Sequence, residues 1–253
     1  MAADVEPLPD RPAAVATLDG ERTLLVADYH AGLEERLRRE GVELDGRGEQ
    51  RRRRLLALLD EARAERLAIL GDLGHAIGDP GRDERAELTA LFEAIPADVA
   101  VTVVAGNHDG DLAALLDDLD REVRATTAHG IRLGDVGLVH GHTWPSPHVL
   151  EADVVCMGHE HPVVRIEDEV GGVRKERVWL RGRLHPDPFV EYHDRDLAID
   201  GDLVVFPAFN DLSGGTWINV EGQSFLSPFL PDGLADGEAY MLDGTRLGPY
   251  REV

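Results

Sequence analysis

The chain has 253 residues, of which 49 are acidic and 26 basic, and its formal net charge at pH 7 is −23. No apolar run reaches the roughly 18 residues that a membrane-spanning helix needs, so the sequence excludes a protein anchored by such helices. The acidic balance also argues against a protein that binds nucleic acid or anionic membranes through a generic basic surface.

The acidic residues are spread along the whole chain, and Lys175 is the single lysine. This composition resembles that of proteins from salt-in halophiles, whose carboxylate-rich surfaces stay hydrated in concentrated salt. At molar ionic strength the Debye length falls to about 3 Å, which screens repulsion between the carboxylates. We therefore expect a halophilic archaeal source; the alternative is an ordinary acidic protein from a GC-rich genome.

The ends of the chain and its thiol content say little about compartment. Residues 1–10 lack the basic region and apolar segment of a secretory signal. Cys156 is the only cysteine, so no disulfide can form within the chain, and its place in an apolar run predicts a buried filler. We expect a cytoplasmic location.

Taken in chain order, the first half alternates strand and helix. Residues 1–22 are expected to form a loose leader. Apolar runs predict strands over 23–27, 67–70, 99–105, 137–139 and 154–157, and amphipathic patterns predict helices over 32–40, 48–66, 83–94 and 111–119. This alternation predicts a mostly parallel sheet with helices outside it.

After Pro162 the pattern changes. Short apolar runs at 163–166, 178–180, 203–206 and the end of the chain, joined by Gly, Asp and Pro, predict a second and more antiparallel sheet packed on the first. Residues 183–202 are expected to form an exposed loop. No linker or internal repeat is evident, so residues 1–253 are predicted to form one domain.

Four consecutive arginines occur near the start of the helix expected over 48–66, from Arg51 to Arg54. Consecutive residues fan around a helix axis and do not form one basic face. We therefore predict a solvated helix start whose arginines pair with nearby acids.

Five short clusters of Asp, Asn and His side chains each follow an expected strand. They are Asp28-Tyr29-His30, Gly71-Asp72-Leu73-Gly74-His75, Gly106-Asn107-His108-Asp109, His140-Gly141-His142 and Gly158-His159-Glu160-His161. Ligands of open α/β sheets gather beyond the carboxyl ends of the strands, which is where these clusters fall.

Together the clusters supply enough oxygen and nitrogen atoms to hold two divalent metal ions. Asp28 and His30, two residues apart on an extended segment, point to one side, and His159 and His161 share this spacing. Asp72, in a glycine-flanked turn, is the candidate bridging carboxylate, while Asn107 and His140 complete the second ion. Mixed Asp, Asn and His ligands suit Mn²⁺, Fe²⁺ or Zn²⁺ better than Mg²⁺ or Ca²⁺, and we expect Mn²⁺.

Such a pair of metals suits the hydrolysis of phosphate esters. Two ions about 3.5–4 Å apart can share one hydroxide for in-line attack and clamp the ester. His108 follows a ligand and is expected to be catalytic, by protonating the leaving oxygen or stabilising phosphoryl charge, with Asp109 fixing its tautomer. His142 is a candidate phosphate contact; otherwise it is a hydrogen-bonding loop residue.

The order DxH, GDxxH, GNHD, HGH, GHxH resembles that of the calcineurin-like metallophosphoesterases. The context of the first and last clusters, and the stretches 207–215 and 225–230, look like small archaeal and bacterial phosphoesterases related to the Mre11/SbcD nucleases. The resemblance implies a four-layer α/β/β/α sandwich with two mixed β-sheets. It also implies one metal bound by Asp28, His30, Asp72 and His161, and a second bound by Asp72, Asn107, His140 and His159.

This chain departs from the commoner GDxxD form, because His75 ends its second motif. We assign His75 to substrate contact or to support of the ligands. The chain also lacks room for the DNA-capping and coiled-coil parts of the large nucleases, which argues against processive double-strand-break processing.

Three functions follow, and the sequence does not separate the first two. One is a phosphodiesterase or nuclease-like hydrolase acting on a nucleotide or single-stranded nucleic acid, which the motif context favours. Another is a phosphomonoesterase acting on a small molecule or phosphoprotein. A third is a non-catalytic interaction module on the same fold, which the complete ligand set argues against. No membrane partner is expected, and the sequence gives no oligomeric state.

Overall fold

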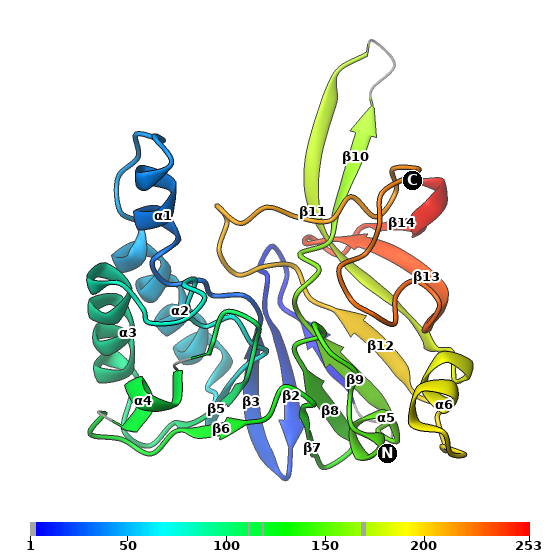
Figure 1. The fold of residues 1–253 in the computed structure, drawn as a ribbon, viewed down its shortest axis with the longest axis horizontal. Coiled ribbons are helices and arrows are strands. Elements are labelled where there is room, and N and C mark those ends of the chain that lie inside the picture. The colour runs from blue at the N-terminus through cyan, green and yellow to red at the C-terminus, as the bar shows by residue number, and fades with distance from the viewer. Residues whose placement is uncertain (1–3, 111, 118, 168–170) are drawn as a thin grey trace.

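The computed structural model describes residues 4–110, 112–117, 119–167 and 171–253, which form two β-sheets packed face to face between layers of helices (Figure 1). The first sheet has the order β1-β2-β3-β4-β5-β6. Strands β3 to β6 are parallel to one another, while β1, β2 and β3 pair antiparallel. Its strands are β1 (Val5–Pro7), β2 (Ala14–Leu18), β3 (Glu21–Val26), β4 (Arg66–Ile69), β5 (Ala100–Val104) and β6 (Arg124–Thr126).

The second sheet has the order β14-β13-β11-β12-β9-β8-β7, and β10 pairs with β11. Among the described strands of this second sheet, only the β8–β9 and β9–β12 pairs are parallel. Its strands are β7 (Ile131–Leu133), β8 (Val136–Val139), β9 (Val154–Met157), β10 (Val163–Glu167), β11 (Val173–Leu184), β12 (Asp202–Val205), β13 (Leu234–Met241) and β14 (Arg246–Pro249). The β10–β11 hairpin projects beyond the rest of the sheet (Figure 1).

Three apolar cores separate four layers, which confirms the predicted α/β/β/α sandwich with two mixed sheets. Successive side chains of a strand point to opposite faces, so Leu24 of β3 packs toward the helices and Leu25 toward the second sheet. The helices are α1 (Leu33–Arg39), α2 (Gly48–Ala62), α3 (Arg82–Ala94) and α4 (Leu112–Asp117) beside the first sheet, and α5 (Pro147–Leu150) and α6 (Asp187–His193) beside the second. Among the described residues, no helix has the length and apolarity to cross a bilayer.

The expected leader over residues 1–22 is wrong for its described part. Strands β1 and β2 occupy much of it and complete the first sheet. Val15 packs in the core under the helices, and Ala14 and Ala16 pack between the sheets. The small alanine side chains gave no clear alternation, which is why sequence reasoning missed this strand.

The exposed loop expected over 183–202 is also wrong in part. Strand β11 continues to Leu184, and α6 follows from Asp187 to His193. Phe189 of that helix is fully buried and anchors it against the second sheet. The polar composition of the segment hid this one apolar contact.

The boundary between the sheets does not lie at Pro162. Strands β8 and β9 precede it and belong to the second sheet. The helix expected over 48–66 also ends earlier, at Ala62, because Arg63 adopts the left-handed conformation and the chain then enters β4. The helix expected over 111–119 is present as α4, and positions 111 and 118 lie outside the described residues.

The arginine run of α2 is solvated only in part. Arg51 is buried, and its guanidinium contacts Glu34 of α1 at 3.0 Å and Glu87 of α3 at 2.7 Å. Arg53, two residues later, is exposed and pairs with Glu49. The fan of consecutive residues therefore directs Arg51 between three helices, so the prediction of a solvated run is wrong for this residue.

We expect Arg51→Ala to lower the free energy of unfolding by about 3–5 kcal/mol, because Glu34 and Glu87 would keep buried charges without their partner. The matched control is Arg53→Ala, which removes an exposed pair and should cost about 0.5 kcal/mol or less. Denaturant unfolding of both variants measures the difference. Equal losses would contradict the assignment of Arg51 as the cation that joins α1, α2 and α3.

Candidate metal centre

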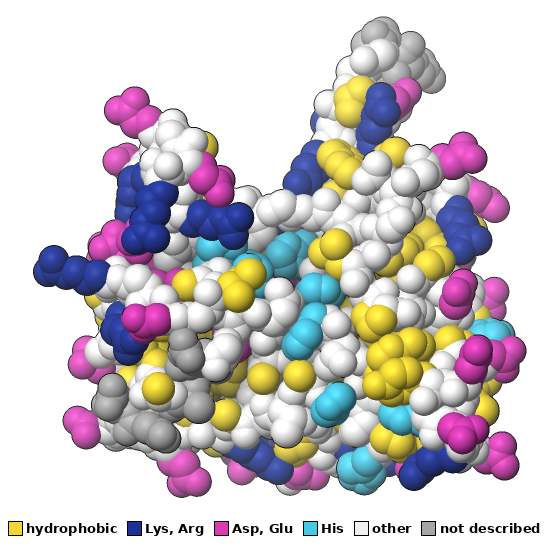
Figure 2. Space-filling view, in the orientation of Figure 1, with side chains coloured by type: hydrophobic (Ala, Val, Ile, Leu, Met, Phe, Trp, Pro, Cys, Tyr) yellow, Lys and Arg dark blue, Asp and Glu magenta, His cyan; other side chains and the backbone are white. Residues whose placement is uncertain are grey.

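The five predicted clusters meet at one edge of the sandwich, where strands of both sheets end. The first three follow β3, β4 and β5 of the first sheet, and the last two follow β8 and β9 of the second. Backbone hydrogen bonds join the first two clusters, from Asp28 N–H to the Gly71 carbonyl and from His30 N–H to the Asp72 carbonyl. Histidine side chains gather in a hollow of the surface there (Figure 2).

The backbone of this edge is unusually strained. Five candidate ligands have positive φ angles, namely Asp28 (57°), His30 (48°), Asp72 (47°), His159 (68°) and His161 (45°). Non-glycine residues seldom adopt this region, at a cost of roughly 1–3 kcal/mol each, and such residues cluster at functional sites. The expectation that Asp28 and His30, and likewise His159 and His161, lie on extended segments is therefore wrong, because turns with positive φ angles bring these side chains together.

Two glycines allow the turns to pack this tightly. A Cβ atom on Gly71 would lie 2.3 Å from the ring of His140, and one on Gly106 would lie 2.1 Å from a carboxylate oxygen of Asp72. Both distances are far below contact, so any larger residue would displace a candidate ligand. This explains why glycine precedes Asp72 and Asn107.

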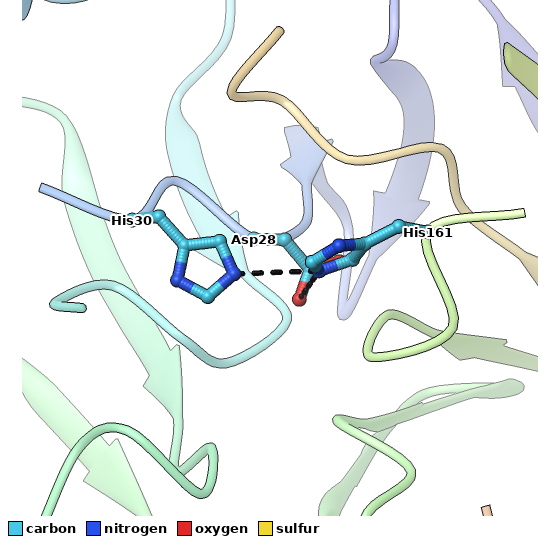
Figure 3. Close-up of side chains that lie close together, drawn as sticks. All are labelled: Asp28, His30 and His161. Atoms are coloured by element: carbon cyan, nitrogen blue, oxygen red, sulfur yellow. Dashed lines mark hydrogen bonds and ion pairs between the residues drawn. The ribbon is translucent and has the colours of Figure 1, made fainter. Parts of the chain in front are cut away.

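The first donor group consists of Asp28, His30 and His161, which point toward one another (Figure 3). His161 Nε2 lies 3.2 Å from Asp28 Oδ1 and 3.3 Å from His30 Nε2. The carboxylate of Asp28 is fully buried and also accepts the N–H of His159 at 3.2 Å. Three donor atoms from both sheets thus converge within coordination reach of a single ion.

The second donor group consists of Asp72, His140 and His159. His140 donates its Nδ1–H to the Leu70 carbonyl at 2.9 Å, which leaves Nε2 free as a donor of electrons to a metal. That Nε2 atom lies 3.3 Å from Asp72 Oδ1 and 3.1 Å from Asn107 Oδ1. The geometry therefore places Asn107 beside this group.

Asp72 lies between the two groups. Its Oδ1 faces His140 at 3.3 Å, and its Oδ2 faces His30 Nε2 at 3.8 Å. The N–H of His108 donates to Oδ1 at 2.9 Å and holds the carboxylate in this orientation. One carboxylate thus presents one oxygen to each group, as a bridging ligand would.

The donor set fits divalent metal binding. It combines carboxylate oxygens and imidazole nitrogens, and within each group the candidate ligand atoms lie within 4.8 Å of one another. No thiolate takes part, because Cys156 is buried within β9 between the sheets. Burial raises the pKa of that thiol to about 12, as expected for an inert apolar filler.

Charges in the site are arranged in pairs. Burial raises the pKa values of Asp28 and Asp72, but contacts with His161 and His140 outweigh it, so both pKa values lie below their usual range. Burial lowers the pKa of His140, yet the hydrogen bond and charge of Asp72 raise it to about 9, and Asp28 similarly raises that of His161. Burial dominates at four further histidines, lowering the pKa to about 3 for His30 and to about 4 for His75, His142 and His159.

His108 lies at the edge of the two groups, with its Nε2 4.0 Å from Asp72 Oδ2. Its Nδ1–H donates to the carbonyl of His75 at 2.6 Å. The expectation that Asp109 fixes the tautomer of His108 is therefore wrong. Asp109 is buried and instead accepts the N–H groups of Gly74 (3.1 Å) and Gly106 (2.8 Å), which ties the second cluster to the third.

His75 and His142, the two histidines predicted to contact substrate or to support the ligands, lie on different sides of the site. The ring of His75 stacks on that of His108, with centroids 5.0 Å apart, and its Nδ1 lies 3.3 Å from Nδ1 of His30. His142 lies on the other side, 5.2 Å from the ring of His140 and 6.0 Å from that of His159. Its Nδ1 is buried and has no hydrogen-bond partner among the described residues.

Two supporting residues were missed in the sequence. Glu160, between His159 and His161, is buried and accepts the N–H groups of Leu226 (3.1 Å) and Ser227 (2.6 Å). Asn210 is buried and donates its side-chain N–H to the His30 carbonyl at 3.1 Å. Strand alternation could not have indicated Glu160, because His159 and His161 have positive φ angles and the segment between them is bent.

A family model and one solved structure agree with the fold. The family model described as calcineurin-like phosphoesterase matches residues 21–163. Among solved structures, a nuclease of Pseudomonas putida, nuclease MPE, is similar with a TM-score of 0.58 and 22% identity, covering 96% of this chain and 100% of that one. Yfce, a phosphoesterase from E. coli, matches with a TM-score of 0.36 and 22% identity over 58% of this chain and 73% of its own. No curated protein matches in sequence.

We expect Mn²⁺ affinity to increase with pH between about pH 6 and about pH 9, because metal ligation requires neutral imidazoles. Without metal, the pKa of His140 is raised to about 9, so His140 carries a proton at neutral pH, and the pKa of His161 is raised as well. Binding must release the proton of His140, and the release should shrink as the pH approaches about 9. Calorimetric titration in two buffers of different ionisation enthalpy measures affinity and proton release together. An affinity independent of pH in this range would contradict the prediction.

Proposed function

Since the chain belongs to the calcineurin-like phosphoesterase family, we propose that it is a phosphodiesterase or nuclease-like hydrolase that uses two divalent metal ions. One observation carries this proposal above the others. Asp72 belongs to the second donor group, yet its Oδ2 also lies 3.8 Å from His30 Nε2 of the first, and His108 lies beside that carboxylate.

In the proposed arrangement Asp28, His30, Asp72 and His161 hold the first ion, and Asp72, Asn107, His140 and His159 hold the second. Mn²⁺ is the proposed metal, with Fe²⁺ and Zn²⁺ as alternatives that the same ligands suit. When bound, a pair of such ions supplies an activated water and neutralises charge on the phosphoryl oxygens.

Residues that are not proposed ligands, or that hold the ligands in place, account for proton transfer and for the orientation of the site. With its Nδ1–H donated to the His75 carbonyl, His108 can carry a second proton on Nε2 and deliver it to the leaving oxygen. The hydrogen bond to the His75 carbonyl fixes the orientation of that imidazole, and the ring of His75 stacks on it. Asp28 and Asp72 orient the histidines around them, because each carboxylate is itself held by a backbone N–H.

The shape of the site supports a diester substrate. A cavity of about 730 Å³ adjoins the donor groups, and leucines of α1 and of the segment 212–226 line it. A cavity of this size and lining accommodates an organic group in addition to a phosphate. A fold shared with a nuclease is compatible with this choice, although at 22% identity it carries the fold alone.

We expect the protein, with added Mn²⁺, to hydrolyse bis-p-nitrophenyl phosphate faster than p-nitrophenyl phosphate, because the cavity has room for a second organic group. Rates should be measured in concentrated salt, because salt screens the repulsion that a net charge of −23 causes. A chelator-treated sample serves as the control. Faster hydrolysis of the monoester would select a phosphomonoesterase. If the protein binds metal but hydrolyses neither compound, the proposal that it is a phosphoesterase is wrong.

We expect His108→Ala to lower kcat by about 10²–10⁴ because the leaving oxygen loses its proton donor. Metal affinity should stay within about twofold, since His108 is not a proposed ligand. His148→Ala is a suitable control, because His148 is exposed at α5. Full activity of the His108 variant would refute its role.

A further inference from the structure

The cavity beside the donor groups is much larger than a phosphate group needs. Its volume is about 730 Å³, and its walls come from α1 on one side and from the segment 212–226 on the other. Four leucines contribute to it, including Leu226, which is 61% exposed. A substrate therefore places a sizeable organic part here, next to the scissile phosphate.

The cavity contains one permanent cation. Arg36 of α1 is the only Arg or Lys among the described residues that line it, in a chain whose net charge is −23. The guanidinium Nη1 lies 3.4 Å from His75 Nε2, and His75 stacks on His108. His75 thus lies between Arg36 and His108, the residue proposed to protonate the leaving oxygen.

Arg36 is held by a partner that can be exchanged. Its Nε donates to Glu40 Oε1 at 2.9 Å, in a pair of residues four apart on α1 that are each about half exposed. Exposed pairs of this kind are weak. A terminal phosphate carries more negative charge than a carboxylate and offers a guanidinium an equally good bidentate contact, so it competes well for Arg36.

We propose that the substrate carries a second phosphate beside the scissile one, as an oligonucleotide does, and that Arg36 binds it in exchange for Glu40. This inference rests on the proposed phosphodiesterase function and names its substrate class. The site is also open to a polymer: a notch above the histidines separates α1 from the β10–β11 hairpin, and basic side chains lie on both projections (Figure 2). A strand can therefore enter and leave the site along this notch.

The test uses two substrates that differ only in the second phosphate. One is a dinucleotide joined by a single phosphodiester, and the other is the same dinucleotide with an added terminal phosphate, made at either end in turn. With Mn²⁺ and at the lowest salt at which the protein stays folded, we expect kcat/KM to be about tenfold higher for one phosphorylated form, as a charge-assisted contact provides. Arg36→Gln should abolish this preference, and Glu40→Gln should increase it.

A salt titration separates binding from a structural role. For a single-stranded oligonucleotide, Arg36→Gln should reduce the slope of log(kcat/KM) against log salt by about 0.7, the value for one lost phosphate contact. The matched control is Arg53→Gln, because Arg53 also pairs with a Glu four residues away, yet on α2 and outside the cavity. The control should keep both the preference and the slope.

The outcomes distinguish the two proposals. No hydrolysis of bis-p-nitrophenyl phosphate by the unaltered protein would overturn the proposed function. Hydrolysis of that diester without a preference for the added phosphate, or with a preference that survives Arg36→Gln, would overturn the role of Arg36 alone.

Discussion

Two buried carboxylates hold the two sheets together at the edge where the candidate metal centre lies. Asp28 follows a strand of the first sheet and accepts the N–H of His159, which follows a strand of the second. Asp72 also follows a strand of the first sheet and faces His140 from the second at 3.3 Å. Every candidate ligand depends on these contacts, because a shift of one sheet against the other would separate the donor groups.

The same carboxylates impose an electrostatic condition on the fold. Two negative charges without exposure to water are costly unless cations compensate them. The imidazoles of His140 and His161 can supply that charge, and a pair of divalent ions would do so more strongly. The positive φ angles at five candidate ligands show that the backbone is held under strain to keep these groups convergent.

Buried polar contacts outside the donor groups set the walls of the cavity. Arg51 of α2 forms ion pairs with Glu34 of α1 and with Glu87 of α3. These pairs hold α1, which carries Arg36, against the other two helices. Glu160 fastens the opposite wall by accepting the N–H groups of Leu226 and Ser227. Both segments that line the cavity are therefore stabilised by buried polar contacts, which favours a site that is preorganised for its substrate.

The sequence by itself determined the local features: apolar runs that end at clusters of Asp, Asn and His, the glycines that permit tight turns, and the four-layer fold implied by motif order. Only the tertiary structure assigned β8 and β9 to the second sheet, because an apolar run has the same local pattern whichever sheet it joins. It also decided that the His75 carbonyl, and not Asp109, fixes the tautomer of His108, and that Arg51 is buried. Those contacts join residues that are far apart in the chain or packed against other elements, and no spacing within one segment encodes them.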